Sequence, residues 1–218
     1  MGFHDIVIDA DIVFLIFKIH KLQYEGVSHF FELLKSVLNW KLLISEEVEG
    51  ELQDPFSIAL KEKLVKEGIL ERFQPSNSQE LKEIAQAYKD LRRIMHKGEA
   101  SCFAIAKCKG FFVLSHDHEA YGLLAPEIKN KFSRFSFYEM LYLLNREGAI
   151  SDNKAQGYID ALGSLPDFTL PVEIRRAGFS GIKSLYDKKY GNRRQPSKAK
   201  ASPGIKKKML RMNEGENS

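Results

Sequence analysis

Two hydrophobic patterns alternate along the chain. Short runs of apolar, often β-branched residues predict buried strands at 4–9, 41–44, 68–73 and 111–114. Longer segments with apolar residues every three or four positions predict helices at 10–21, 27–40, 46–66 with a break near Pro55, 79–95, 98–109, 136–148 and 151–162, and two short helices around Gly178 within 172–190. Alternating strands and helices predict a three-layer α/β/α fold, in which a parallel sheet carries helices on both faces.

Polar and glycine residues at the edges of these segments support the predicted helix boundaries. Ser45 is suited to cap the helix that follows the strand at 41–44. Ser136 and Glu139 have the spacing of a capping box, and Gly110 is a natural stop for the helix at 98–109.

Charge divides the chain into two parts. Residues 187–218 hold ten Lys or Arg and three acids, for a net charge of +7, whereas residues 1–186 hold 23 basic and 26 acidic side chains, for −3. The segment 191–218 also lacks apolar periodicity, so we expect a folded domain at 1–190 and a disordered basic tail. The tail either adds solubility or binds nucleic-acid phosphates. The residues expected to bind nucleic-acid phosphates are the basic ones, Arg193, Arg194, Lys206, Lys207 and Lys208.

Several classes of protein are excluded by what the sequence lacks. Two cysteines, Cys102 and Cys108, cannot form a disulfide framework or a four-thiolate zinc site, which favours a reducing cytoplasmic setting. The apolar run at 6–17 is short and contains two aspartates, so we expect no membrane span and no export signal. There is also no glycine-rich phosphate loop of the GxxxxGK type.

Four acids occupy positions that suggest a shared site. Asp9 ends the first predicted strand, and Asp117 lies three residues beyond the strand at 111–114. Glu51 lies in a helix that follows a strand, and Glu99 opens the helix that leads into the strand at 111–114. Ligands of doubly wound sheets bind beyond the carboxyl ends of the strands. Converging carboxylates repel one another unless a cation is present, and they suit Mg²⁺ or Mn²⁺.

Each of these acids also has an ordinary structural interpretation. Asp9 and Asp117 could be turn or N-cap residues, and Glu99 could complement a helix N-terminus. Glu51 could be a solvated helix residue, and we expect Asp11 mainly to cap the helix after the first strand. The order and context of the four acids together, rather than any one of them, favour a metal site.

The chain resembles the PIN domain family of metal-dependent nucleases over about residues 5–190. The matching segments are VIDADIVFLI (7–16), LISEEVEGEL (43–52), KGEASCFAIAKCKGFFVLSHD (97–117) and EMLYLLNREGAIS (139–151). The GEAS sequence and IRRAGF (174–179) are similar to a bacterial and archaeal, toxin-like branch.

The resemblance assigns roles to individual residues. It implies that the catalytic acids are Asp9, Glu51, Glu99 and Asp117. Of these, Asp9, Glu99 and Asp117 are the expected metal ligands, and Glu51 completes the cage or orients water. In the outer shell it implies Asp11, Ser115 and Glu119. Glu47, one helical turn before Glu51 on the same helix face, is the alternative for the helix acid.

We therefore expect a Mg²⁺- or Mn²⁺-dependent endoribonuclease. The resemblance also implies a homodimer and a small inhibitory, antitoxin-like partner protein. Two alternatives remain open at this point: a PIN-like scaffold that binds nucleic acid or protein without cutting it, and a nuclease that cleaves DNA. His116, Asp117 and His118 also suggest an HD-type phosphohydrolase, but that class is helical and this pair follows a predicted strand.

Overall fold

A computed structural model describes residues 4–116, 134–166 and 168–190 of the chain. Contacts divide the chain into two compact units, Met1–Ser184 and Leu185–Ser218. Within the described ranges, no helix is both long and apolar enough to cross a lipid bilayer.

The fold is mixed α/β, with every strand pair of the described sheet parallel. The strands are β1 (His4–Ile8), β2 (Trp40–Ile44), β3 (Glu71–Arg72), β4 (Phe112–Leu114) and β5 (Arg134–Phe135). Their order is β3-β2-β1-β4-β5, so β1 lies at the centre. The chain leaves β1 toward β2 on one side and later returns to its other side as β4. The carboxyl ends of β1 and β4 therefore flank the topological switch point.

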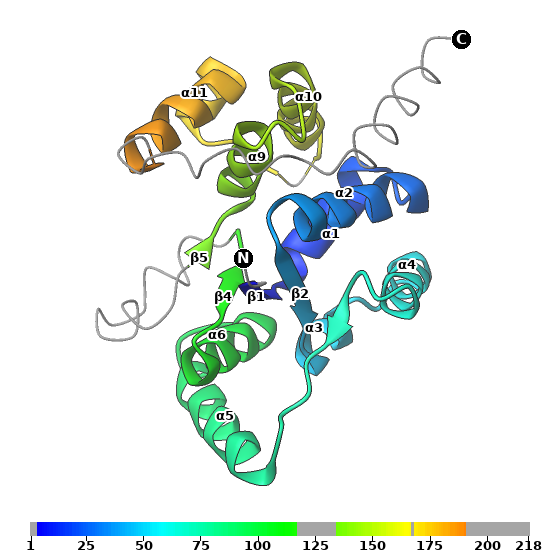
Figure 1. Ribbon diagram of the computed structural model, residues 1–218, viewed down its shortest axis with the longest axis vertical. Helices are drawn as coiled ribbons and strands as arrows, with labels where there is room; N and C mark the ends of the chain where they lie inside the picture. The colour runs from blue at the N-terminus through cyan, green and yellow to red at the C-terminus, as the bar shows by residue number, and fades with distance from the viewer. Residues whose placement is uncertain (1–3, 117–133, 167, 191–218) are drawn as a thin grey trace. The chain divides into compact units, whose positions relative to one another are not determined.

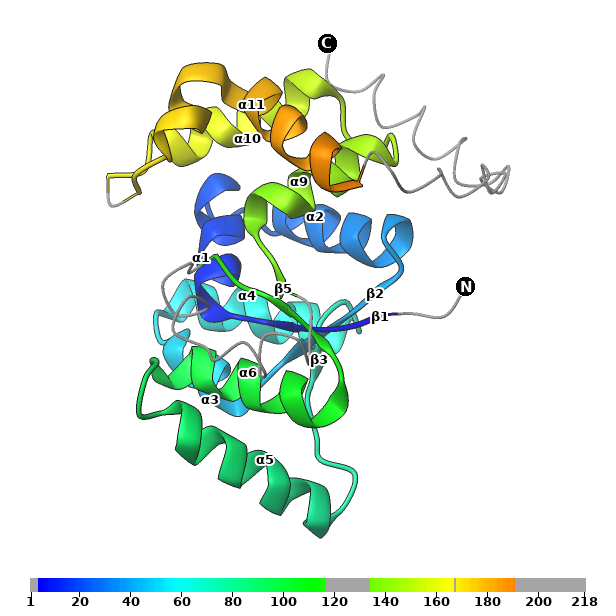
Figure 2. The ribbon, with the colours of Figure 1, turned by 90° about the vertical axis from the view of Figure 1, so that its left-hand side faces the viewer.

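Helices cover both faces of the sheet, which confirms the predicted three-layer architecture. The helices of the first unit include α1 (Ala10–Ile19), α2 (Tyr24–Val37), α3 (Glu46–Glu51), α4 (Pro55–Lys66), α5 (Ser78–Leu91), α6 (Lys97–Lys109), α9 (Phe137–Arg146) and α10 (Asp152–Gly163). Figures 1 and 2 show α1, α2, α9 and α10 on one side of the sheet and α3, α5 and α6 on the other. Because both faces are covered, Ile6, Val7 and Ile8 of β1 are fully buried.

Two strands differ from the sequence prediction. The strand predicted at 68–73 is reduced to the two residues of β3, because Gly68 has a φ of +66° and the amides of Ile69 and Leu70 bond to Leu64 O. Strand β5 was not predicted, since a run of two residues carries no periodic signal.

Three predicted helix boundaries are confirmed by capping contacts, whereas the helix predicted at 27–40 spans Tyr24–Val37 and Trp40 begins β2. Ser45 Oγ accepts a hydrogen bond from Val48 N at 3.3 Å, and Ser136 Oγ accepts one from Glu139 N at 3.2 Å. Gly110 ends α6 with a φ of +70°. Helix α11 (Val172–Tyr190) is interrupted at Gly178, whose φ of +57° and ψ of −143° are not helical, as two short helices require.

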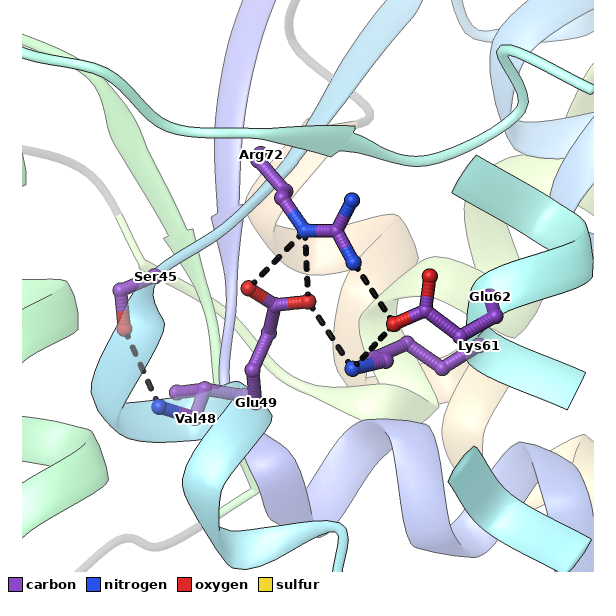
Figure 3. A network of polar contacts seen from close by, with 6 residues as sticks. All are labelled: Ser45, Val48, Glu49, Lys61, Glu62 and Arg72. Atoms are coloured by element: carbon purple, nitrogen blue, oxygen red, sulfur yellow. Dashed lines mark hydrogen bonds and ion pairs between the residues drawn. The ribbon is translucent and has the colours of Figure 1, made fainter. Parts of the chain in front are cut away.

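A network of ion pairs holds α3 against α4 and β3. Lys61 Nζ on α4 lies 3.0 Å from Glu49 Oε1 on α3 and 2.9 Å from Glu62 Oε1. Arg72 on β3 contacts the same two carboxylates, through Nε at 2.9 Å and Nη2 at 2.6 Å (Figure 3). Only 8% of the Lys61 side chain and 16% of the Glu49 side chain are exposed, so removal of either partner would leave a largely buried charge without its counter-charge.

His20, at the end of α1, should make stability depend on pH. Its ring packs against Phe30 and Tyr158, with centroids 5.7 and 5.5 Å away, and burial lowers its pKa to about 4. Positive charge on Lys154 lowers this pKa further. Because the unfolded state takes up the proton first, near pH 6.5, stability should fall as the pH drops from about 6.5 to about 4.

We expect the wild-type free energy of unfolding to fall between pH 7 and pH 5 by about 1 kcal/mol more than that of His20→Gln, allowing for the partly exposed ring. Urea denaturation at both pH values measures this difference. Equal pH dependence in the two proteins would contradict it.

Candidate metal centre

Asp9 lies at the switch point of the sheet, immediately after β1. Its backbone N–H donates to Leu114 O of β4 at 2.9 Å, so the carboxyl ends of the two strands meet here. Asp9 is the N-cap of α1, and its Oδ1 accepts a hydrogen bond of 2.8 Å from Ala10 N. Only 3% of the residue is exposed. The strand, the helix and the cap together fix the position of this carboxylate at the carboxyl end of β1.

The environment of Asp9 opposes its negative charge. Burial raises the pKa of Asp9 well above its usual range, and the negative charges of Asp11 and Glu99 raise it further. The Ala10 amide and a weaker contact with the Ser115 hydroxyl only partly offset this rise. Asp9 Oδ2 is buried and accepts no well-formed hydrogen bond from a described residue. A carboxylate in this state is suited to a cation, which supplies the missing positive partner.

Asp11 does not cap α1, contrary to the main expectation for it. The strand ends at Ile8, so Asp9 occupies the N-cap and Asp11 falls in the first turn of the helix. Its Oδ2 accepts a hydrogen bond of 2.7 Å from His116 N, just beyond β4. Asp11 therefore links α1 to the segment after β4 and adds negative charge beside Asp9. The sequence feature that could have indicated this contact is the presence of two acids, Asp9 and Asp11, directly after a buried strand.

Glu51 and Glu99 reach the site from the helices on one side of the sheet. Glu99, on α6, is 7% exposed, and its Oε2 also accepts a hydrogen bond of 3.3 Å from His96 N. Glu99 therefore lies in the first turn of the helix that leads to β4, as predicted, and it also caps the N-terminus of that helix. Glu51, the last residue of α3, is exposed, and its Oε1 accepts a hydrogen bond of 2.8 Å from Gly98 N.

The buried thiol of Cys102 indicates how the described acids converge. Its Sγ donates to Ile8 O at 3.6 Å, beneath the end of β1. Burial raises the pKa of Cys102 well above its usual range, and four negative charges raise it further. These charges belong to Asp9, Asp11, Glu51 and Glu99. The acids that act electrostatically on Cys102 thus come from three separated segments of the chain, and we refer to these four residues as the acidic cluster.

Glu47 belongs to a different part of the surface. Its Oε2 accepts a hydrogen bond of 2.9 Å from Ser101 Oγ. Glu47 and Ser101 line a cavity of about 450 Å³ at the ends of β2 and β3. The geometry therefore favours Glu51 over Glu47 as the helix acid of the cluster. Sequence alone left both open, because the two residues are one turn apart on the same helix.

Several predicted site residues cannot be placed. Asp117, Glu119 and the basic residues of the predicted tail (Arg193, Arg194, Lys206, Lys207 and Lys208) lie outside the described residues. Among the residues that are described, no three His, Cys, Asp or Glu side chains are grouped closely enough to hold one metal ion. Ser115 is fully buried after β4, and its backbone N–H donates to Phe135 O at 3.1 Å.

The acidic cluster consists of carboxylates, whose oxygens are of the type that hard cations prefer. Carboxylate oxygens are the ligands that Mg²⁺ and Mn²⁺ prefer, and the described cluster contains no thiolate or imidazole that would favour zinc. The thiol of Cys102 is held protonated by its surroundings, which makes it a poor ligand. Comparisons of the chain with protein-family models and with curated proteins find no match.

Proposed function

We propose that this protein is a metal-dependent endonuclease of the PIN type that hydrolyses RNA. The observation that carries the proposal is the buried carboxylate of Asp9, at the switch point of a parallel sheet, whose pKa the negative charges of Asp11 and Glu99 raise. Such a cluster is unfavourable without a divalent cation, and its position is where doubly wound folds bind ligands.

The acidic cluster supports a division of labour among its residues. Asp9 and Glu99, both buried, would hold the ion, and Asp117 is proposed as a further ligand. When bound, Mg²⁺ or Mn²⁺ neutralises these carboxylates and stabilises the charge that develops on the phosphodiester. Glu51 is exposed, so its carboxylate is suited to orient the attacking water and accept its proton. Asp11 holds the segment after β4 through the amide of His116.

Cleavage by the full chain tests the proposal. Single-stranded RNA and DNA of the same sequence, labelled at the 5′ end, should be incubated with the protein in Mg²⁺, in Mn²⁺ or in excess chelator. We expect RNA fragments with either metal and none with chelator. If neither substrate is cut, or if cutting survives the chelator, the proposal is wrong. If only DNA is cut, the protein is a deoxyribonuclease and the assignment of RNA as its substrate is wrong.

A further inference from the structure

Gly98 is the second residue of α6, and Glu51 lies directly against it. The Gly98 N–H donates a hydrogen bond of 2.8 Å to Glu51 Oε1. A β-carbon at residue 98 would lie 2.7 Å from Oε1, 2.9 Å from Cδ and 2.9 Å from Oε2 of Glu51. All three distances are far below ordinary van der Waals contact. The carboxylate therefore occupies space that is open only because residue 98 has no side chain.

A β-carbon at residue 98 would clash only with the carboxylate group of Glu51. Gly98 is helical and does not have a positive φ, so alanine fits its backbone, and alanine has the higher helix propensity. The atoms that a β-carbon would meet are the end of a flexible side chain, not backbone. An alanine at this position should therefore displace the Glu51 carboxylate while it leaves α6 intact.

The hydrogen bond between Glu51 and Gly98 is one of two that join α3 to α6 in the described part of the chain. Glu47 and Glu51 are one turn apart on α3, and each accepts a hydrogen bond from α6, from Ser101 Oγ and Gly98 N respectively. The first contact uses a side chain and tolerates adjustment. The second uses a backbone N–H near a helix N-terminus, where the direction is fixed and negative charge is favoured.

We infer that Gly98 is the positioning residue for Glu51, since its missing side chain lets the carboxylate lie against the N-terminal turn of α6, the turn that carries Glu99. The consequence of this position for catalysis rests on the proposed nuclease function. The position itself does not, so the two can be tested separately.

Amide hydrogen exchange at residue 98, followed by NMR, tests the position. The proteins are wild type, Gly98→Ala, Glu51→Ala and the matched control Gly50→Ala, whose added methyl group meets no atom within 4 Å. We expect protection at residue 98, corrected for intrinsic rates, to fall about 5-fold or more in Gly98→Ala and in Glu51→Ala. It should stay unchanged in Gly50→Ala. Full protection in Gly98→Ala would overturn the inference.

Cleavage of the RNA substrate by the same proteins, with the double variant Gly98→Ala/Glu51→Ala, tests the consequence. Gly98→Ala should melt no lower than wild type yet cleave about 10- to 100-fold more slowly, with the loss in kcat. The double variant should cleave no more slowly than Glu51→Ala, because both changes remove the same contact. Additive losses, or wild-type cleavage by Gly98→Ala, would overturn the inference.

The two failures are distinguishable. If wild type does not cleave nucleic acid, the proposed function is wrong, and the exchange measurement alone decides whether Gly98 positions Glu51. If wild type cleaves and Glu51→Ala cleaves equally well, the nuclease function stands and the positioning role in catalysis is wrong.

Discussion

Asp9→Asn should abolish metal-dependent cleavage and at the same time stabilise the metal-free protein. Asparagine keeps an oxygen that can accept the hydrogen bond from Ala10 N, so the cap of α1 survives. It removes the charge that the buried site opposes. We expect cleavage to fall at least ~1,000-fold, about 4 kcal/mol in transition-state stabilisation. The metal-free protein should gain about 1 to 2 kcal/mol in its free energy of unfolding at pH 8.

The pH dependence of this gain has a definite sign. The pKa of Asp9 is raised in the folded state, so wild type binds more protons when folded than when unfolded. Wild-type stability therefore rises as the pH falls through the folded-state pKa, and the advantage of Asp9→Asn should shrink. Urea denaturation of both proteins in chelator, at a series of pH values, measures the difference.

Mn²⁺ titration followed by thermal melting completes the test of Asp9. Wild type should be stabilised by about 2.7 kcal/mol when free Mn²⁺ is 100 times its dissociation constant, and Asp9→Asn much less. Asp160→Asn is the matched control, because Asp160 lies on α10, is exposed, and its carboxylate bonds only to Gln156 in the described structure. Asp160→Asn should behave as wild type in every measurement. An active Asp9→Asn variant would refute the metal-site assignment.

Glu49→Ala should cause the largest loss of stability among the variants considered. It leaves the buried ammonium of Lys61 with Glu62, whose side chain is 50% exposed, and it removes one partner of Arg72. Since a buried charge that loses its partner is costly, we expect a loss of about 2 to 3 kcal/mol in the free energy of unfolding. Urea denaturation at pH 7 measures it.

Two further variants separate this effect from a general loss of charge. Glu62→Ala, at the exposed end of the network, should cost less than about 1 kcal/mol. Lys61→Met in the Glu49→Ala background should recover part of the loss, because it removes the unpaired charge and keeps an apolar side chain. Equal losses in Glu49→Ala and Glu62→Ala would contradict the buried character of the network.

The layered α/β architecture was predictable because its signals are local. The consecutive apolar residues of β1 and the periodic pattern of α5 each appear within a few residues of sequence. Capping residues such as Ser45 act on amides three positions away, so they too are readable from sequence. The sequence pattern predicts too long a strand at β3 and no strand at β5. A strand of two residues forms because a neighbouring strand pairs with it, and so short a strand has no periodic pattern.

Some features of the candidate site were likewise predictable from local sequence, and others depend on tertiary contacts. The sequence by itself determined that Asp9 lies at the carboxyl end of a buried strand, directly after its last residue, and that Glu99 lies in the first turn of the helix leading to β4, since both facts depend on neighbours in the chain. Only the tertiary structure decided that Glu51, and not Glu47, joins the acidic cluster, and that Asp11 contacts His116. It also decided that Gly98 leaves room for a carboxylate from another helix. These contacts join residues that are separated by 47 to 105 positions in the sequence. Residues so far apart in the chain are brought together only by the tertiary packing of strands and helices.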